Sequence, residues 1–289
     1  MKKDNQHNEL NSDMDFLNSL PEIEMSFSKS KDDVWKELSM KTAAPAKEVK
    51  VIKLQWAKYA AVACIAILLG LTGFINLYTK TIYCPKGEHL SVLLPDQSEV
   101  DLNANSSISY KPYWWKVSRK VKFEGEAFFK ITKGSKFEIA SNYGKTYILG
   151  TSFNIYARGN QYKVTCYTGK VKVVSTLTSD KILLLPNDHA YVTKNGLLEL
   201  RKCDNSEAKI SWRNNLFFFT DTPIRTVFEE IELQYNINIV EKGKFSSTYT
   251  GNFDLGKSVD STLYNVCMPM GLKFVKGPNN NYIITTKAQ

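Results

Sequence analysis

Residues 59–79 read YAAVACIAILLGLTGFINLYT, and no charged side chain occurs between Lys58 and Lys80. At about 1.5 Å per residue, a helix of this length spans roughly 30 Å, the hydrocarbon thickness of a bilayer. A buried core helix is one alternative, but such helices are usually shorter. A cleaved signal peptide is another, but it would begin near residue 1. The sequence therefore predicts one transmembrane helix, residues 59–79, in a single-pass membrane protein.

The charges beside this segment predict its orientation. The N-terminal side carries an excess of lysine, whereas acidic residues accompany the lysines that follow the segment. The residues concerned are Lys41, Lys47, Lys50, Lys53 and Lys58 with Glu48 before it, and Lys80 and Lys86 with Glu88, Asp96 and Glu99 after it. Because cytoplasmic flanks carry the lysine excess, we expect residues 1–58 in the cytoplasm. The rest would lie outside the inner membrane, in the periplasm of a Gram-negative cell.

The composition suits a folded protein rather than a nucleic-acid-binding one. Of the 289 residues, 43% are hydrophobic and 23% are charged, so the chain can bury real cores. The net charge is +9, but residues 1–58 are neutral overall, so the basic excess would face away from DNA. We expect those lysines to be spread over a solvated surface.

The cysteines and histidines indicate no metal site and leave the disulfide state open. Cys64 lies in the predicted span, and the other four cysteines, Cys84, Cys166, Cys203 and Cys267, form no C-x-x-C pair. One disulfide among those four is compatible with the periplasm, and so are separate buried thiols. The three histidines match no zinc pattern. We expect no cofactor and no metal.

The predicted cytoplasmic arm contains two short amphipathic stretches. The first has apolar residues at helical spacing and is interrupted by Pro21. The second begins with Ser30 as a cap, and Asp32 and Asp33 fall in its first turn. Helices this short cannot bury their apolar faces alone. We expect the arm to dock into a groove of a cytoplasmic protein; the alternative is a loosely ordered tail. The candidate contact residues are Phe16, Leu17, Leu20, Ile23, Trp35 and Leu38.

Residues 80–205 read as a succession of short strands divided by turns. The strands alternate apolar and polar positions and are rich in β-branched and aromatic residues. A weak repeat places Gly125, Gly150 and Gly169 before alternating apolar residues. A glycine at each corner suits a β-solenoid. A sandwich or a barrel is the structural alternative.

The strand-rich region carries no convincing catalytic motif. Glu124 and Glu126 flank Gly125, but two acids beside a turn glycine are more often a solvated strand end than a glycosidase pair. No G-x-S-x-G elbow, phosphate loop or H-E-x-x-H sequence occurs. We therefore expect a protein that is not an enzyme.

Four ordered blocks in this region resemble the FecR family of membrane-anchored sigma-factor regulators. They are LPDQSEVDLNANSSISY at 94–110, FEGEAFFKIT at 123–132, ILGTSFNIYA at 148–157 and TGKVKVV at 168–174. Two departures stand out: Gln97 replaces a usual glycine, and Asn187 and His189 replace a usual glycine and glutamine. These changes put the local turn geometry in question.

The composition changes at Trp212, and residues 212–289 read as a small α/β module. The expected order is β-α-β-β-α-β-β, with two helices on one face of a sheet. TDTPIRTVFEEIELQYNINI at 220–239 and TGNFDLGKSVDSTLYNVC at 250–267 resemble the C-terminal domain of FecR-like anti-sigma factors, which is similar to secretin and TonB N-terminal domains. Such a module would signal by pairing strand edges or helices with a partner. The alternative is that it only caps the strand-rich domain.

The resemblance implies a signal relay across the membrane. Residues 1–58 would sequester an extracytoplasmic-function (ECF) sigma factor, and the outside part would sense the signalling domain of an outer-membrane TonB-dependent transporter. It also implies release by envelope proteases, for which the small residues of the span form a candidate intramembrane cleavage region: Ala60, Ala61, Ala63, Ala66, Gly70 and Gly73. Ordinary packing is the alternative role of these residues.

A different class of function is a membrane-tethered periplasmic carbohydrate-binding or scaffold protein. Tyr113, Trp114 and Trp115 could line a sugar groove in such a protein. The missing acid pair and the unexplained cytoplasmic arm count against it.

Overall fold

The computed structural model describes residues 28–43, 55–203, 206–243 and 245–286, together with positions 19, 21 and 26. The chain divides into two units, residues 1–61 and 62–289. The described helices are α2 (Lys31–Thr42), α3 (Gln55–Leu77), α4 (Ile224–Tyr235) and α5 (Val259–Cys267).

Helix α2 forms where its cap and charges predict. Ser30 is the N-cap, and the backbone N–H of Asp33 donates to Ser30 Oγ at 3.2 Å. Asp32 and Asp33 occupy the first turn and Lys41 the last, which complements the helix dipole. No residue of α2 is buried within the structure.

Helix α3 is the one described helix long and apolar enough to cross a membrane. Residues Trp56–Leu77 have a mean hydropathy of 2.2, and none of this stretch is buried. The helix begins four residues before the predicted segment and ends two residues before its end, because backbone hydrogen bonding continues past the apolar stretch at one end and strand β1 begins at Lys80 at the other. This helix fits a single-pass membrane protein.

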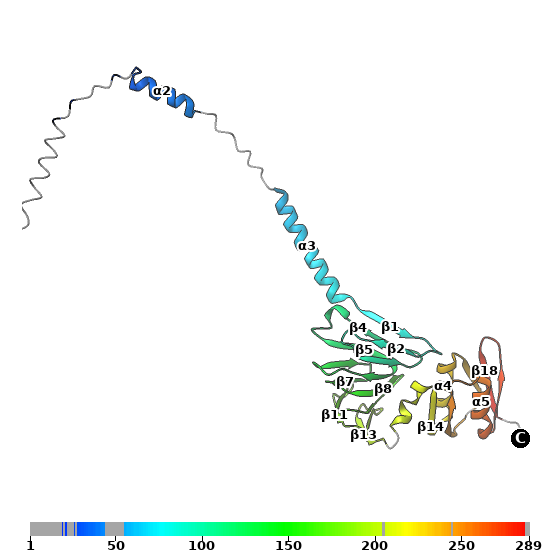
Figure 1. Ribbon diagram of the computed structural model, residues 1–289. Coiled ribbons are helices and arrows are strands. Elements are labelled where there is room, and N and C mark those ends of the chain that lie inside the picture. Colours follow the sequence, from blue (N-terminus) through cyan, green and yellow to red (C-terminus); the bar gives the residue numbers. More distant parts are fainter. Residues whose placement is uncertain are drawn as a thin grey trace, which may run out of the picture. The chain divides into compact units, whose positions relative to one another are not determined.

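Residues 80–202 form thirteen strands of one continuous sheet, as Figure 1 shows in cyan, green and yellow-green. The strands are β1 (Lys80–Cys84), β2 (Leu90–Leu93), β3 (Glu99–Leu102), β4 (Ser106–Tyr110), β5 (Arg119–Lys130), β6 (Phe137–Ala140), β7 (Gly144–Ile148), β8 (Ser152–Arg158), β9 (Gln161–Cys166), β10 (Val171–Ser175), β11 (Lys181–Leu184), β12 (Asp188–Val192) and β13 (Leu198–Lys202).

Strand β5 belongs to both halves of this sheet. Its first half pairs with β4 and β6, and its second half pairs with β3 and β8. One half of the sheet therefore runs β1-β4-β5-β6-β7-β10-β11, and the other runs β2-β3-β5-β8-β9-β12-β13. The change occurs at Gly125, whose φ is +110°. The two halves together form a nearly closed, barrel-like sheet.

The strand pairing does not confirm the predicted solenoid. Coils of a β-solenoid stack their strands in parallel, whereas among the described strands of this sheet only the β5–β6 pair is parallel. Gly125 lies inside a strand rather than at a corner, so the glycine repeat does not mark successive coils. The alternation that predicted the strands was correct, and the barrel-like alternative describes their arrangement better.

One apolar core fills the space between the two halves. It includes Phe123, Phe129, Phe137 and Phe153, all of which are buried. The rings of Phe129 and Phe153 stack with centroids 5.2 Å apart. Tyr162 of β9 approaches β7 so closely that a Cβ at Gly144 would overlap its ring. The core side chains thus come from both halves and hold them face to face.

The two departures from the family pattern keep the backbone that glycine would adopt. Gln97 has φ +64° and Asn187 has φ +67°, both in the left-handed region. Asn tolerates this region better than most residues, and Gln adopts it at a cost of roughly 1–2 kcal/mol. The turn geometry that the sequence put in question is therefore retained without glycine.

Residues 216–286 form the C-terminal module. Its strands are β14 (Leu216–Pro223), β15 (Asn238–Lys242), β16 (Thr248–Asp254), β17 (Leu272–Lys276) and β18 (Asn281–Thr286). With α4 and α5 the element order is the predicted one, but the strands form two sheets rather than one. β14 pairs only with β16, while β15-β18-β17 form a three-stranded sheet. A second apolar core, which includes Val227, Phe228 and Leu263, lies among these elements.

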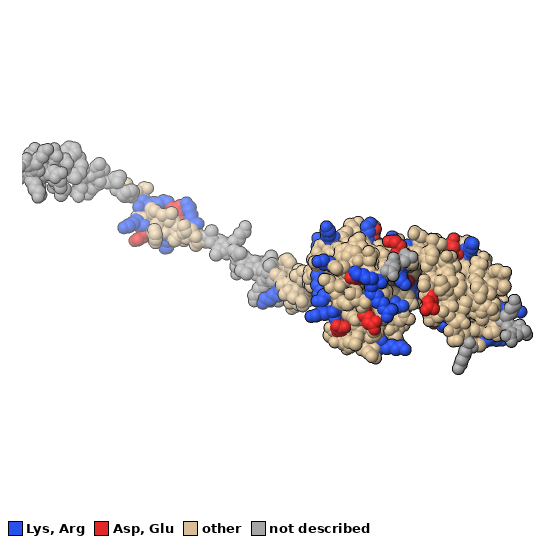
Figure 2. Space-filling model, turned by 90° about the horizontal axis from the view of Figure 1, so that it is seen from below, with Lys and Arg blue, Asp and Glu red and all other residues tan. Residues whose placement is uncertain are grey.

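Lysine and arginine side chains are spread over the strand-rich part, with acidic residues between them, on the face shown in Figure 2. This agrees with the expectation of a solvated basic surface rather than a single nucleic-acid patch.

Gly125→Ala should lower the free energy of unfolding by about 3 kcal/mol, because a Cβ at this position would overlap the backbone and side chain of Ser106 and φ is unfavourable for alanine. Gly159→Ala is the matched control, since Gly159 also has positive φ but no atom within 4 Å of its Cβ position. It should cost about 1 kcal/mol. Urea unfolding of the detergent-solubilised chain measures both, and equal costs would show that the close packing at Gly125 does not stabilise the sheet.

Candidate functional site

The described part of the N-terminal arm, residues 1–58, presents apolar side chains to solvent. On α2, Trp35 is 74% exposed, Leu38 49% and Val34 43%. These side chains lie within one turn of each other, so they form one apolar surface. Of the predicted contact residues, Trp35 and Leu38 lie on this surface. Phe16, Leu17, Leu20 and Ile23 lie outside the described residues.

Charged pairs surround the apolar surface of α2. Glu37 accepts from Lys29 Nζ at 2.7 Å and from Lys41 Nζ at 3.2 Å. Lys29, and after it Lys41, lowers the pKa of Glu37. Exposed ion pairs contribute little to stability. A partner would therefore stabilise α2 mainly by covering its apolar surface.

The small residues proposed for cleavage all lie in α3. A Cβ at Gly70 or Gly73 would meet no atom within 4 Å, so neither glycine is required by packing in the described structure. Thr72 Oγ1 donates to the Leu68 carbonyl at 2.8 Å, and Asn76 Nδ2 donates to the Thr72 carbonyl at 2.8 Å. These two polar side chains are thus satisfied by the backbone of the helix itself, as a bilayer requires.

A buried polar network joins the strand-rich module to the C-terminal module. Gln234 of α4 donates from Nε2 to Asn103 Oδ1 and to Glu230 Oε1, both at 2.7 Å. Its Oε1 accepts from His89 Nε2 at 2.9 Å. Asn103 Nδ2 in turn donates to Glu126 Oε2 at 2.9 Å. We call these residues the junction network.

Ionic and apolar contacts surround the junction network. Arg213 binds Asp101 with 2.7 Å between Nη2 and Oδ2, and Arg158 Nη1 lies 3.9 Å from Glu230 Oε2. Phe128 of β5 packs into the core of the C-terminal module. Tyr167, which follows β9, packs against the same core. The junction therefore combines apolar contacts from two aromatic side chains with several polar bonds that water could replace.

Glu126 is the most perturbed acid of the junction. Burial raises the pKa of its carboxyl above the usual range, and the nearby Glu230 raises it further. Arg158 and the hydrogen bonds from Asn154 and Asn103 act in the opposite direction. We take burial as the dominant cause because the side chain is almost inaccessible to water.

A cleft of about 990 Å³ lies beside the junction. Lys163, His189 and Tyr191 line it from the strand-rich module, and Phe218 and Thr220 line it from β14. Burial, and after it Lys209, Lys163 and Arg201, lowers the pKa of His189 to about 4. The imidazole is therefore neutral near pH 7, and a hydrogen bond of 2.8 Å joins its Nδ1 to Thr165 Oγ1.

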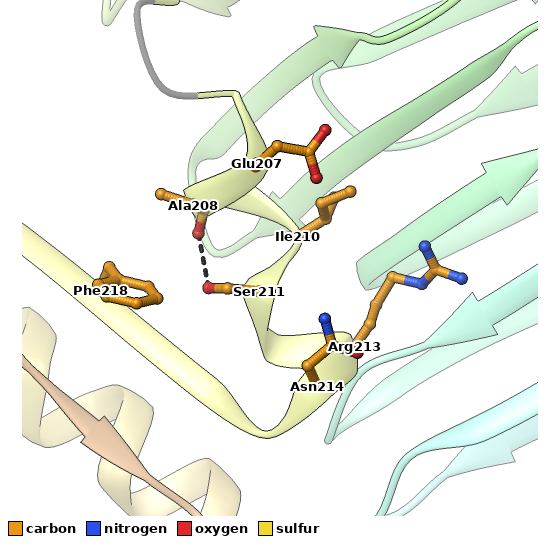
Figure 3. Close-up of a pocket in the computed structure, with 7 residues that line it drawn as sticks. All are labelled: Glu207, Ala208, Ile210, Ser211, Arg213, Asn214 and Phe218. Carbon is orange, nitrogen blue, oxygen red and sulfur yellow. Dashed lines mark hydrogen bonds between the residues drawn. The ribbon is translucent and has the colours of Figure 1, made fainter.

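A smaller hollow of about 350 Å³ lies where the chain passes between the two modules. Figure 3 shows it between the short 3₁₀ turns and β14, with Arg213 and Phe218 on its wall. Ser211 Oγ donates to the Ala208 carbonyl at 2.9 Å and shapes the turn. The hollow is a groove at the surface between the 3₁₀ turns of residues 207–214 and strand β14.

The comparisons with known proteins agree on one family. Residues 80–172 match the model of the FecR protein family, and residues 216–285 match that of the FecR C-terminal domain. This chain belongs to the FecR family of anti-sigma factors.

Two solved structures of a candidate anti-sigma factor from Parabacteroides distasonis resemble this FecR-family chain. Both are 28% identical to it and are covered over their whole length. They cover 73% and 72% of this chain, with TM-scores of 0.66 and 0.65. A comparison with curated proteins gives no match. The family is regulatory, and its anti-sigma role implies a sigma factor as partner.

Two features considered from the sequence do not form the sites that they suggested. Glu124 is exposed whereas Glu126 is buried in the junction. The two carboxyl groups therefore lie in different environments and do not form a catalytic pair. Trp115 is buried against Tyr110 and Phe137, with ring centroids 5.4 Å and 5.6 Å away. A sugar groove lined by Tyr113, Trp114 and Trp115 together is therefore not present.

The cysteines are separate thiols. All five are free. Burial raises the pKa of Cys84 and of Cys166 to about 11 and that of Cys267 to about 12. Such thiols are poor nucleophiles at neutral pH. Among the described residues, no group of three or more His, Cys, Asp or Glu side chains could hold a metal.

Sequence reasoning missed the junction network. Gln234 is buried on the apolar face of α4, three residues after Ile231 and seven after Val227. A polar residue within such an apolar stripe was the available signal, because a buried amide requires hydrogen-bond partners. The identity of those partners depends on the contact between modules and could not be read from local pattern.

Glu126→Gln should remove a pH-dependent loss of stability. Because the folded-state pKa of Glu126 is raised, the folded state binds more protons than the unfolded state between the two pKa values, so stability falls as pH rises from about 4.5. The difference in unfolding free energy, variant minus wild type, should therefore grow with pH. Chemical denaturation at several pH values measures it. A difference that stays constant with pH would contradict a raised pKa.

Proposed function

We propose that this protein is a single-pass inner-membrane anti-sigma factor that sequesters an ECF sigma factor in the cytoplasm. It would relay a signal from the periplasmic signalling domain of an outer-membrane TonB-dependent transporter. The apolar surface of α2, on the lysine-rich side of α3, is the observation that carries the proposal.

The distribution of lysine supports the orientation. Lysines are concentrated in the sequence just before α3. The cytoplasmic flanks of membrane-spanning helices carry such an excess of basic residues. With that orientation α2 lies in the same compartment as RNA polymerase. The exposed Trp35 and Leu38 suit a groove on a helical partner.

Sequestration then acts by mass action. A sigma factor held by α2 and the rest of the arm is removed from the pool that can bind polymerase, and its free concentration falls with the affinity of the complex. Tethering the arm to the membrane also keeps the complex away from the nucleoid. The ECF class of sigma factor is proposed from the family resemblance.

The C-terminal module would receive the periplasmic signal. Strands β14 and β16 pair only with each other among the described strands, so each has a free edge. Phe218 of β14 is 48% exposed, and the cleft lies beside that strand. A free edge beside an open cleft supports strand addition by a signalling domain.

Release of the sigma factor would follow from proteolysis within helix α3. Ala60, Ala61, Ala63, Ala66, Gly70 and Gly73 lie on α3, and glycine lowers helix stability by about 1 kcal/mol relative to alanine. Local unwinding near the two glycines would expose the backbone to an intramembrane protease.

Trp35→Ala should weaken sigma-factor binding by about 2 kcal/mol, or roughly 30-fold, because it removes the largest exposed apolar side chain of α2. Met40→Ala is the matched control, since Met40 is 71% exposed but projects from the opposite side of the helix. Titration of the detergent-solubilised full chain with each ECF sigma factor of the same cell measures both affinities.

Equal affinities for wild type and Trp35→Ala would remove Trp35 from the contact surface. Failure of every ECF sigma factor to bind the wild-type chain would overturn the proposed function and favour a periplasmic binding or scaffold role.

A further inference from the structure

The turn that joins β4 to β5 contacts the end of α3. The ring of Tyr113 lies 6.2 Å from that of Phe74 and 5.5 Å from that of Tyr78, measured between centroids. Lys111 Nζ donates to the backbone carbonyl of Asn76 at 2.6 Å. Figure 1 shows the end of β4 beside this end of α3.

The length of α3 sets the depth of this contact when the helix spans a bilayer. From Tyr59 to Tyr78 the helix rises about 29 Å, which matches the roughly 30 Å of hydrocarbon. Tyrosines prefer the two interfaces of a membrane. With Tyr59 at one interface, Tyr78 lies at the other, and Tyr113, which packs against it, lies at the same level.

The turn is tied to the core and presents apolar side chains outward. The buried Trp115 anchors it to the core, and the N–H groups of Val117 and Ser118 both donate to the Trp114 carbonyl at 3.0 Å. On the outside, Tyr113 is 60% exposed, Trp114 37% and Val117 70%. Transfer of three such side chains on one short turn from water to a less polar environment would be favourable.

Only basic charges accompany these side chains. Lys80, Lys111 and Lys116 are exposed, and no acidic residue occurs between Leu77 and Glu88 or between Tyr110 and Glu124. Aromatic rings with lysines are the composition found at the headgroup level of membranes, where lysine meets lipid phosphate.

We propose that residues 111–118 form an interfacial anchor, in which Tyr113, Trp114 and Val117 enter the headgroup layer of the bilayer that α3 spans while Lys111 and Lys116 face lipid phosphates. The anchor rests on the membrane span of α3 and is independent of sigma-factor binding. It fixes the strand-rich module against the membrane surface, so that the module cannot swing freely about the end of the helix.

Fluorescence quenching by brominated lipid tests the anchor. The full chain is reconstituted into phosphatidylethanolamine–phosphatidylglycerol vesicles whose acyl chains carry bromine near the headgroup, and flotation verifies its insertion. Trp56 and Trp114 are then the tryptophans at the membrane interfaces, so Trp114→Phe should lower the lipid-quenched emission by about half. Trp212→Phe is the control, because Trp212 is buried beside the C-terminal core, and it should leave that emission unchanged.

A second pair of variants guards against an indirect effect of losing Trp114. In the Trp114→Phe chain, Val117→Trp should restore the lost quenching, whereas Val275→Trp should not, although Val117 and Val275 are similarly exposed at 70% and 62%. Unchanged quenching in Trp114→Phe, equal quenching of the two introduced tryptophans, or failure of the chain to float with the vesicles would each overturn the proposal.

Discussion

The bend of β5 at Gly125, where the strand passes from one half of the sheet to the other, is the constraint on which the architecture of residues 80–202 depends. Because the two halves of this strand pair in different halves of the sheet, their registers are set by one continuous segment. The absence of a Cβ lets the backbone of β5 approach Ser106, whose Oγ accepts from the Glu126 N–H at 2.9 Å and donates to the Glu126 carbonyl at 3.0 Å. The residue after the bend is thereby held in place, and its carboxyl group reaches the junction network. The same strand thus shapes the barrel-like sheet and positions the contact with the C-terminal module.

The two modules differ in how they are stabilised internally and how they are joined. Each has an apolar core of its own. Between them, Phe128 and the half-buried Tyr167 supply apolar contacts. Hydrogen bonds and ion pairs such as Gln234–Asn103 and Arg158–Glu230 supply the polar contacts. Separating polar pairs that water can replace costs far less than opening a core. A partner that competes for these groups could therefore change the contact between the modules without unfolding either of them, which is the property that the proposed sensing role needs.

Local chemistry made much of this structure predictable, and long-range pairing limited the rest. The uncharged run of residues 59–79 was sufficient to predict helix α3, and Ser30 correctly predicted the start of α2. Alternating apolar residues located the strands, but alternation carries no information on which strands are neighbours. The glycine repeat therefore suggested a solenoid, although Gly125 lies inside a strand that two half-sheets share. Trp115 belongs to the core while its neighbour Trp114 is exposed, a difference that depends on where the turn after β4 docks. The contact residues of the N-terminal arm were predicted from amphipathicity alone, and only part of the arm is described.

A single spanning helix limits how a signal can cross the membrane. At the C-terminal end of α3, Phe74, Asn76 and Tyr78 contact the turn after β4. Within the described residues of one chain, α3 has no second spanning helix against which it could shift between two packed states. Information can then pass by moving the outer end or by cutting the chain, and moving the end is opposed by every contact that fixes it at the membrane surface. If the turn anchors the module to lipid, small rearrangements outside are absorbed there, and cleavage within α3 is the step that can free the arm completely. On this argument the proposed anchor would protect the anti-sigma state from accidental motion, and the proposed cleavage of α3 would make release of the sigma factor irreversible.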